Sequence, residues 1–235
     1  MSNKKIKAIL FDKDGVLVDF QATYGTVTRE IMEQLSQGNG ELLARLASDV
    51  GFNLSSGLID PVSSLVEGCA EDICAIWAEV LRRPNDREFQ ISVDAMFKQL
   101  TETNVVLIDG VGEVLNVLGA NYYLGLATND TQACARAQLS FARVLQHFKF
   151  LAGYDSGHGP KPGTGMAEAF LANCSLNADQ VVMVGDSIHD MNFAKSAGMT
   201  AIGISTGPLP ADDLSVHAEH MIDSLDELQP LIKQL

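Results

Sequence analysis

The segment Ile9-Leu10-Phe11-Asp12-Lys13-Asp14-Gly15 decides the fold, and a second segment, Val181-Val182-Met183-Val184-Gly185-Asp186, has the same character far along the chain. Each predicts a buried parallel strand that ends at a turn and exposes carboxylates at its carboxyl end. In an open α/β sheet, ligands bind at that end of the strands. Carboxylates gathered there repel one another, and a cation held by oxygen ligands alone is typical of Mg²⁺. The two segments therefore predict a Mg²⁺ site and a metal-assisted reaction on a phosphate.

The composition is that of an acidic chain with a substantial core. The 235 residues are 46% hydrophobic, which is enough for one large domain or two modest ones. Asp and Glu total 30 against 16 Lys and Arg, a formal net charge of −14. No basic cluster exceeds Lys4-Lys5 or Arg82-Arg83, so we expect no nucleic-acid partner. Because an acidic protein repels anions at long range, any phosphate site must be locally positive.

Cysteine usage and hydropathy indicate a cytoplasmic protein. Cys69, Cys74, Cys134 and Cys174 form no Cys-x-x-Cys pair. We interpret them as small buried hydrophobic residues in a reducing compartment, in preference to catalytic cysteines. Asp12 interrupts the first apolar run too early for a signal peptide, and no run is long enough to span a bilayer. We therefore expect a cytoplasmic location and no membrane partner.

Strand-like runs alternate with helical patterns through most of the chain. The expected strands lie at 5–11, 122–127, 148–152, 181–184 and 200–204. The expected helices lie at 112–119, 131–146, 164–173, 190–197 and 224–234, the last preceded by the apolar stretch His220-Met221-Ile222. This alternation predicts an α/β fold with a parallel sheet and helices on both faces.

Residues 20–104 break this rhythm and contain no convincing strand. Apolar residues recur there at helical spacing, in two sets: Ile73, Ile76, Trp77, Val80 and Leu81, and then Val93, Met96, Phe97 and Leu100. We therefore expect an inserted helical cap at 20–104, and an α/β catalytic core formed by 1–19 and 105–235. Such a cap can exclude water and select the substrate. Its apolar faces, Trp77 included, fit either an internal core or a dimer surface, so we expect a monomer or a homodimer.

Asp12 and Asp14 follow the first strand, and both can approach one site from the loop that Gly15 allows to turn. A carboxylate that is bound to Mg²⁺ and faces a phosphorus atom can attack it and form an aspartyl-phosphate. A second carboxyl group can protonate the leaving oxygen and then deprotonate the hydrolytic water, which contributes roughly 10²–10⁴-fold. The alternative is an Asp-x-Asp-Gly turn without function, because Asp and Gly are ordinary turn residues.

Two further polar segments could bind phosphate oxygens. Thr128 offers a hydroxyl, and Asn129 offers a side-chain amide and a backbone N–H. Helix capping is the alternative for both. Lys161 lies between two prolines that keep it out of a helix interior, so it could neutralise both phosphate and nucleophile. The alternative is an exposed loop lysine; a P-loop is excluded, because proline stands where that motif needs glycine.

Asp186 and Asp190 supply the remaining acid groups. Asp186 follows Gly185 directly, which places it at the strand tip as a predicted metal ligand. Asp190 lies one helical turn further on and could reach the metal through water or orient Lys161. Alternatively, Asp190 is a helix-start residue that is favoured there by the helix dipole.

With these pieces in order, the chain resembles the haloacid dehalogenase superfamily of phosphohydrolases. The first motif, Phe11-Asp12-Lys13-Asp14-Gly15-Val16-Leu17-Val18-Asp19, and the last, Val184-Gly185-Asp186-Ser187-Ile188-His189-Asp190, are specific. Thr128-Asn129 and Lys161-Pro162 fall between them in the expected order. The resemblance covers most of the chain outside 20–104, which takes the place of that family's helical cap. It implies a Rossmann-like sheet of order 5-4-1-2-3.

The resemblance also implies a role for each motif residue. Mg²⁺ would bind between Asp12, the backbone carbonyl of Asp14, and Asp186. Asp12 would be the nucleophile and Asp14 the general acid and base. The residues that would hold the transferring phosphoryl group are Thr128, Asn129 and Lys161, and those that would support the site are Gly15, Ser187 and Asp190.

The pattern looks closest to phosphoglycolate phosphatases, so the expected reaction is hydrolysis of a small phosphorylated metabolite, with 2-phosphoglycolate favoured. Family dehalogenases lack the acid at Asp14, which disfavours dehalogenation. Val16 stands where threonine is commonest, and Thr164 replaces a second proline, so no single subfamily is assigned.

Two other functions stay open. Valine at position 16 also occurs in β-phosphoglucomutase-like members, which makes a sugar phosphomutase the alternative enzyme. A non-enzymatic phospho-acceptor domain is the alternative from another class. Three arginines could meet a substrate carboxylate or could be solvated surface charges: Arg29, Arg82 and Arg83.

Overall fold

The computed structural model describes residues 5–61, 63–67 and 70–235, so Cys69 and the start of the chain before Lys5 lie outside it. The chain divides into two compact units. One is formed by Met1–Asp19 with Val106–Leu235, and the other by Phe20–Val105. Over these described ranges, every helix is either too short or too polar to cross a membrane.

The larger unit is built on a six-stranded sheet in the order β3-β2-β1-β4-β5-β6, with all neighbours parallel. Its strands are β1 (Ala8–Phe11), β2 (Tyr123–Ala127), β3 (Phe150–Ala152), β4 (Val181–Gly185), β5 (Thr200–Ile204) and β6 (His220–Ile222). The expected order 5-4-1-2-3 is confirmed for the first five strands. The apolar stretch before the closing helix adds a sixth strand at the edge, beside β5.

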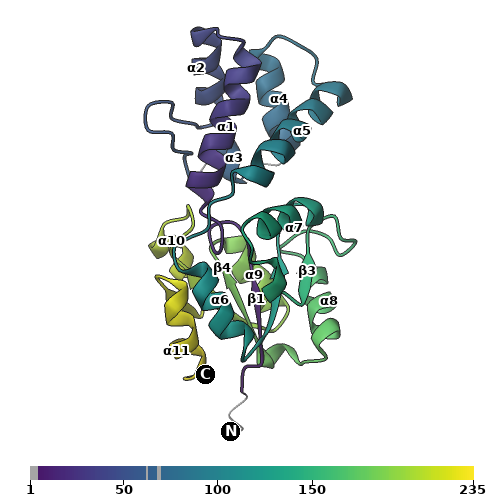
Figure 1. Cartoon of the computed structure of the whole chain (residues 1–235), viewed down its shortest axis with the longest axis vertical. Helices are drawn as coiled ribbons and strands as arrows, with labels where there is room; N and C mark the ends of the chain where they lie inside the picture. The colour runs from purple at the N-terminus through teal and green to yellow at the C-terminus, as the bar shows by residue number, and fades with distance from the viewer. Residues whose placement is uncertain (1–4, 62, 68–69) are drawn as a thin grey trace. The chain divides into compact units, whose positions relative to one another are not determined.

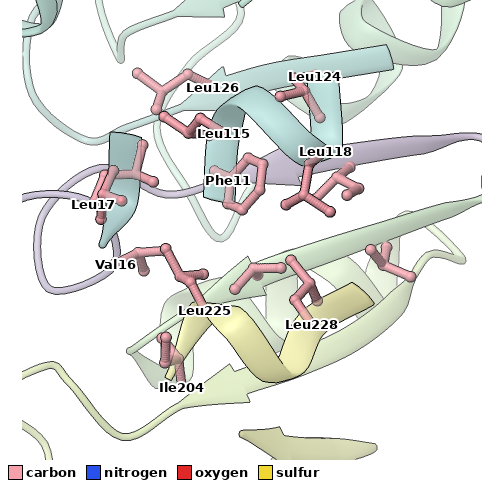
Figure 2. Close-up of a cluster of buried hydrophobic side chains, with 14 of the residues drawn as sticks. Phe11, Val16, Leu17, Leu115, Leu118, Leu124, Leu126, Ile204, Leu225 and Leu228 are labelled. Atoms are coloured by element: carbon pink, nitrogen blue, oxygen red, sulfur yellow. The ribbon is translucent and has the colours of Figure 1, made fainter. Parts of the chain in front are cut away.

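Both faces of this sheet are buried, as its unbroken apolar strands require. Along β1, Ile9 and Phe11 belong to one hydrophobic cluster, whereas Ala8 and Leu10 belong to another. Because successive side chains of a strand point to opposite faces, the two clusters lie on opposite sides of the sheet. Figure 2 shows the first, where Phe11 lies among leucines of the covering helices, including Leu115 and Leu228.

Helices cover these two faces (Figure 1). The first cluster draws on α6 (Val111–Gly119), α7 (Gln132–Phe141) and α11 (Leu228–Ile232), and the second on α8 (Gly165–Cys174), α9 (Ile188–Ser196) and α10 (Ala211–Ser215). Two expected helices are shorter than predicted. The one at 131–146 ends at Phe141 and is followed by a 3₁₀ turn, Leu145–His147, and the one at 224–234 begins with a 3₁₀ turn, Leu225–Glu227. The short α10 was not anticipated.

The smaller unit is helical, and its described residues contain no strand beyond an isolated bridge between Phe52 and Ile59. Its helices are α1 (Phe20–Ser36), α2 (Gly40–Asp49), α3 (Ser64–Glu67), α4 (Ala70–Val80) and α5 (Arg87–Thr103). Trp77 is fully buried, and its indole N–H donates to the Leu46 carbonyl at 3.1 Å. Of the two alternatives for Trp77, the structure therefore favours the internal core.

The cysteines that the structure describes form no disulfide with one another. Cys74 and Cys134 are buried, as expected for small hydrophobic residues. Cys174 is only half-buried, so the expectation of burial was wrong for that residue. It occupies the last position of α8, directly before the left-handed cap residue Ser175.

Candidate active site

The pairing of β1 with β4 brings the two predicted acidic segments together. The register sets Phe11 beside Val184, and the Asp12 N–H donates to the Val184 carbonyl at 2.9 Å. Both strands end at this point, so Asp12 and Asp186 leave the sheet side by side. Carboxylate oxygens of Asp12, Asp186 and Asp190 all lie within 4.8 Å of one another. The site therefore forms at the carboxyl edge of the central strands.

Gly15 shapes the loop that follows β1. Its φ angle is +73°, and a Cβ placed there would lie 2.0 Å from an oxygen of Asp186. Gly207, in the loop after β5, faces the same carboxylate, and a Cβ at that residue would lie 1.9 Å from the same oxygen. The Thr206 hydroxyl donates to the Gly15 carbonyl at 2.6 Å and ties the two loops together. Asp186 therefore sits between two glycines whose lack of a side chain leaves room for its carboxylate.

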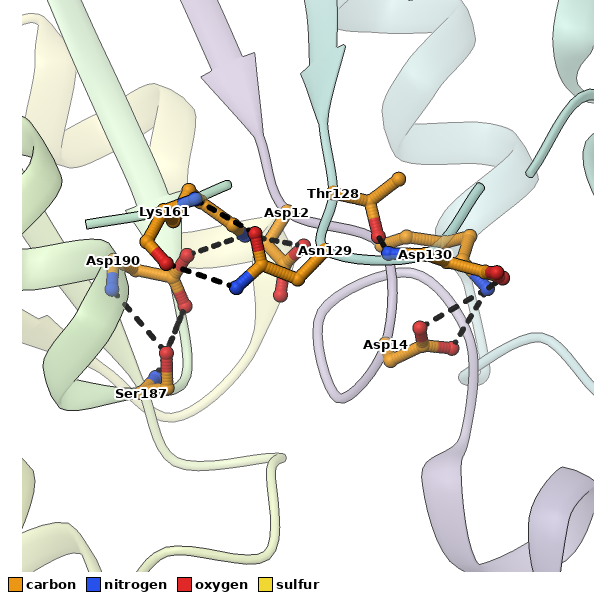
Figure 3. Close-up of polar contacts among 9 residues, drawn as sticks. Asp12, Asp14, Thr128, Asn129, Asp130, Lys161, Ser187 and Asp190 are labelled. Carbon is orange, nitrogen blue, oxygen red and sulfur yellow. Dashed lines mark hydrogen bonds and ion pairs between the residues drawn. The ribbon is translucent and has the colours of Figure 1, made fainter. Parts of the chain in front are cut away.

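Lys161 is the cation at the centre of the acid cluster (Figure 3). Its ammonium group lies 2.7 Å from Asp12 and 2.6 Å from Asp190. The Asn129 side chain holds the backbone of this lysine, because its carbonyl oxygen accepts from the Lys161 N–H at 2.8 Å and its amide donates to the Lys161 carbonyl at 3.1 Å. Lys161 is buried, which is the opposite of the exposed loop lysine considered above.

Asp190 both orients Lys161 and lies in the first turn of a helix, the two structural roles considered for it. It is fully buried, and one oxygen accepts from Lys161. The other accepts from the Ser187 hydroxyl at 2.6 Å and the Ser187 N–H at 3.2 Å, while Ser187 in turn caps the Asp190 N–H. This capping box begins α9 and at the same time orients Lys161.

Thr128 and Asn129 follow β2, the other neighbour of β1 (Figure 3). The Thr128 hydroxyl oxygen accepts from the Asp130 N–H at 3.1 Å, which leaves its own hydrogen available to a ligand. The Asn129 side chain contacts the Lys161 backbone with its oxygen and with one of its two amide hydrogens, so the second amide hydrogen and the backbone N–H are its groups left for a phosphate. Within the described residues, no hydrogen bond uses that N–H.

The combined effect of burial and charge in the site raises the pKa values of Asp12, Asp186 and Lys161. Burial raises the pKa of Asp12 to about 7, against the opposing effect of Lys161, and Asp190 and Asp14 add to the rise. Burial and the neighbouring carboxylates raise the pKa of Asp186 well above its usual value. Burial alone would lower the pKa of Lys161, but Asp12 and Asp190 outweigh it and raise that pKa. The carboxylates therefore carry more negative charge than Lys161 neutralises.

The residues present fit a hard divalent cation. Asp186 is buried, and in the part of the chain that the structure describes no hydrogen bond or ion pair reaches its carboxylate. A buried, unpaired carboxylate is costly unless a cation accompanies it. The donors are carboxylate oxygens only, which is the chemistry of Mg²⁺ rather than of a soft metal. The Asp14 carboxylate lies outside this group of three, and a role for its backbone carbonyl stays a prediction.

Asp14 instead faces a second cation that the sequence did not single out. Lys13 is fully buried, and its ammonium group lies 3.0 Å from both oxygens of Asp14 and 2.9 Å from Asp130. Burial raises the pKa of Asp14, and Asp130 adds to the rise, whereas Lys13 opposes it. The only available signal was a lysine between two aspartates in a strand-end motif, which fits a solvated turn residue equally well.

Two of the arginines considered for a substrate carboxylate are engaged within the helical unit. The Arg29 guanidinium donates to the Leu54 carbonyl and lies 5.6 Å from the Phe52 ring centroid. The Arg83 guanidinium lies 4.3 Å from the Phe89 ring centroid. Both interactions are cation–π contacts that pack the helices of this unit.

Comparison with known proteins agrees with this geometry. The haloacid dehalogenase-like hydrolase family matches residues 69–204. "Probable phosphatase IndB" of Dickeya dadantii is 28% identical over 224 residues, which cover 94% of this chain and 90% of that protein. A phosphoglycolate phosphatase of Chromobacterium violaceum is 27% identical over 99% of both chains. Among solved structures, a candidate β-phosphoglucomutase of Thermotoga maritima superposes with a TM-score of 0.73 at 22% identity, over 98% of this chain and 100% of that one.

The fold and the strand-end carboxylates define an α/β protein with an acidic site at the carboxyl edge of its parallel sheet, and the family match covers more than half of the chain. The chain belongs to the haloacid dehalogenase-like hydrolase family. Its relatives that are named as phosphatases place it among the phosphoric monoester hydrolases of that family.

Proposed function

We propose that this protein is a Mg²⁺-dependent phosphatase that hydrolyses a small phosphomonoester through an aspartyl-phosphate on Asp12. The observation that carries the proposal is the cluster of Asp12, Asp186 and Asp190 within 4.8 Å, with Lys161 against two of its members. Asp12 and Asp186 would hold the ion, which when bound supplies charge neutralisation for the phosphate and the carboxylates. A pairing of Lys161 with Asp12 before substrate arrives keeps the nucleophile in one orientation.

In the first step, a carboxylate oxygen of Asp12 forms a bond to phosphorus, and the bond from phosphorus to the ester oxygen breaks. Asp14 gives its proton to the departing oxygen, so that a neutral alcohol leaves. Its raised pKa favours the protonated form that this step needs. Lys161 would neutralise the charge of the phosphoryl oxygens, and these oxygens would accept hydrogen bonds from the Thr128 hydroxyl and the Asn129 N–H.

In the second step, Asp14 takes a proton from a water molecule whose oxygen bonds to phosphorus. The bond between phosphorus and Asp12 breaks, which releases inorganic phosphate and restores the Asp12 carboxylate. Asp14 is thereby reprotonated and ready for the next turnover. One carboxyl group can serve both steps, because it gives up its proton in the first and regains one in the second.

We propose 2-phosphoglycolate as the favoured substrate and the helical unit Phe20–Val105 as the element that selects it. Support comes from the phosphoglycolate phosphatase that is similar over 99% of both chains. At 27% identity the substrate does not carry over by similarity alone, so a screen of phosphorylated metabolites, with and without Mg²⁺, is the direct test. We expect release of phosphate only with Mg²⁺, and highest kcat/KM for a short phosphorylated acid.

The nucleophile is tested with Asp12→Asn, which keeps the shape of the side chain and removes its charge. We expect turnover to fall on the order of 10³-fold or more with the fold intact. Asp213→Asn is the matched control, because Asp213 is exposed on α10. Full phosphatase activity in pure Asp12→Asn protein would contradict the proposal.

A sugar phosphomutase is the second candidate, and the Thermotoga maritima structure and Val16 are its support. A mutase would use the same aspartyl-phosphate but return the phosphoryl group to a second hydroxyl of the sugar. Incubation with β-glucose 1-phosphate separates the two, because a mutase forms glucose 6-phosphate and a phosphatase releases phosphate. A stable aspartyl-phosphate without turnover would instead favour the phospho-acceptor alternative.

A further inference from the structure

Lys13 is a buried cation that the proposed reaction does not use. It stands between the two aspartates of the first motif, and its side chain is fully buried. Its ammonium group contacts Asp14, Asp130 and the side-chain oxygen of Gln138. An ammonium group has three N–H donors, and these three partners come from three different parts of the chain.

This arrangement is hard to explain as packing. Burial of an ammonium group is unfavourable unless charged and hydrogen-bonding partners compensate it, and an apolar side chain of similar length would fill the same space without that penalty. Gln138, on α7, is also fully buried, and in the part of the chain that the structure describes its amide nitrogen has no hydrogen-bond partner. Lys13 and Gln138 are therefore both buried beside the loop that carries the Asp14 carboxylate.

The partners of Lys13 connect the acid loop to the segment that carries the expected phosphate ligands. Asp130 belongs to the turn after β2, and its N–H donates to the Thr128 hydroxyl. Lys13 thus joins Asp14, in the loop after β1, to the chain that places Thr128. A shift of Asp14 would require Lys13 to leave Asp130 and Gln138 as well.

We propose that Lys13 is a positioning residue, anchored by Asp130 and Gln138, that holds the Asp14 carboxyl group where it meets the leaving oxygen. The proposal rests on the proposed phosphatase function. Lys13 acts through Asp14, so its loss should impair proton transfer and leave the attack by Asp12 on phosphorus unaffected. Loss of Lys13 should therefore reduce activity most on substrates whose leaving oxygen needs a proton.

The test is kcat/KM of Lys13→Met for two substrates: p-nitrophenyl phosphate, whose leaving group departs without a proton, and an alkyl phosphate, whose leaving group needs one. We expect the alkyl phosphate to lose on the order of 10- to 100-fold more activity than p-nitrophenyl phosphate. Asp14→Asn should show the same discrimination, and the double variant should be no worse than Asp14→Asn alone. Lys195→Met, at an exposed position of α9, is the matched control and should match wild type.

Equal losses on both substrates would overturn the proposal and leave Lys13 a structural residue, and so would full activity of Lys13→Met. If Lys13→Met does not fold, Asp130→Asn keeps the side-chain shape and weakens one anchor, and the same discrimination by leaving group is expected at smaller size. If wild type shows no Mg²⁺-dependent activity that Asp12→Asn abolishes, the proposed function fails first. The two failures are therefore distinguishable.

Discussion

Binding of Mg²⁺ should release a proton, because Asp12 has a raised pKa in the metal-free site. The perturbation is a change from pH 8 to pH 6. With a pKa of about 7, Asp12 is about 90% ionised at pH 8 and about 10% at pH 6, so the apparent affinity for Mg²⁺ should fall about tenfold. An aspartate at the ordinary value of 3.8 would give almost no change over this range. Asp186, whose pKa is also raised, can only make the dependence steeper.

Isothermal titration calorimetry in buffers of different ionisation enthalpy measures both the affinity and the protons released. Asp12→Asn should lose its own share of the released protons and reduce that of Asp186, because the Asp12 charge contributes to the raised pKa of Asp186. The reasoning is refuted if wild-type affinity differs by less than about twofold between pH 6 and pH 8, since a group of pKa 7 must then be absent from the site.

The raised pKa of Asp12 also predicts how the stability of the fold depends on pH. Asp12 has a higher pKa in the folded than in the unfolded protein, so the folded state binds more protons between those two values. The stabilisation is therefore present at low pH and is lost as pH rises through 7. It amounts to about 2 kcal/mol between pH 5.5 and pH 8, or a shift of roughly 4–8 °C in Tm for a chain of this size. Thermal unfolding without metal should show this slope in wild type and a smaller slope in Asp12→Asn, where the raised pKa of Asp186 still contributes.

The geometry supports three further predictions. Gly15→Ala should weaken Mg²⁺ binding at least about tenfold in calorimetry, because its Cβ would crowd the Asp186 carboxylate at the tip of β4. Gly110→Ala is the control: it has a similar left-handed strain of about 1 kcal/mol, its Cβ would lie in open space, and it should bind Mg²⁺ normally. Lys161→Met leaves two buried carboxylates without their cation, and denaturant unfolding at pH 8 should show a loss of about 3 kcal/mol together with at least about 100-fold lower kcat. Inorganic phosphate should protect the protein against thermal unfolding only when Mg²⁺ is present, and equal protection by phosphate after chelation would show that the site attracts anions without the ion.

The sheet and the acid cluster could be predicted because both depend on local pattern and on one rule of parallel sheets. The apolar runs before Asp12 and Asp186 define β1 and β4, and neighbouring parallel strands present their ends at one edge. Once these strands pair, the two carboxylates must meet. The short β6 was not predicted, because an apolar stretch of three residues is too short for any period to show.

The contacts between loops could not be predicted, since they depend on which turns meet in space. The Asn129 side chain was considered as a phosphate ligand, and its contacts with the backbone of Lys161, 32 residues away, were not foreseen. Lys13 contacts Gln138 across 125 residues, and Gln138 carries no motif signal. Sequence spacing constrains a helix or a strand, but it says nothing about the partner of a side chain that leaves a strand end.

A phosphate site in so acidic a protein must be locally positive, and the strand ends meet this requirement only in part. Two ammonium groups, Lys13 and Lys161, face five carboxylates around the strand ends: Asp12, Asp14, Asp130, Asp186 and Asp190. The chain alone therefore repels a phosphate dianion. Burial is the main cause of the raised pKa of Asp12, and the neighbouring carboxylates of Asp190 and Asp14 add to it. A divalent cation beside Asp186 removes most of the excess negative charge. Under the proposed function, metal binding would therefore precede productive phosphate binding, because only the metal-loaded site would offer an anion a favourable potential.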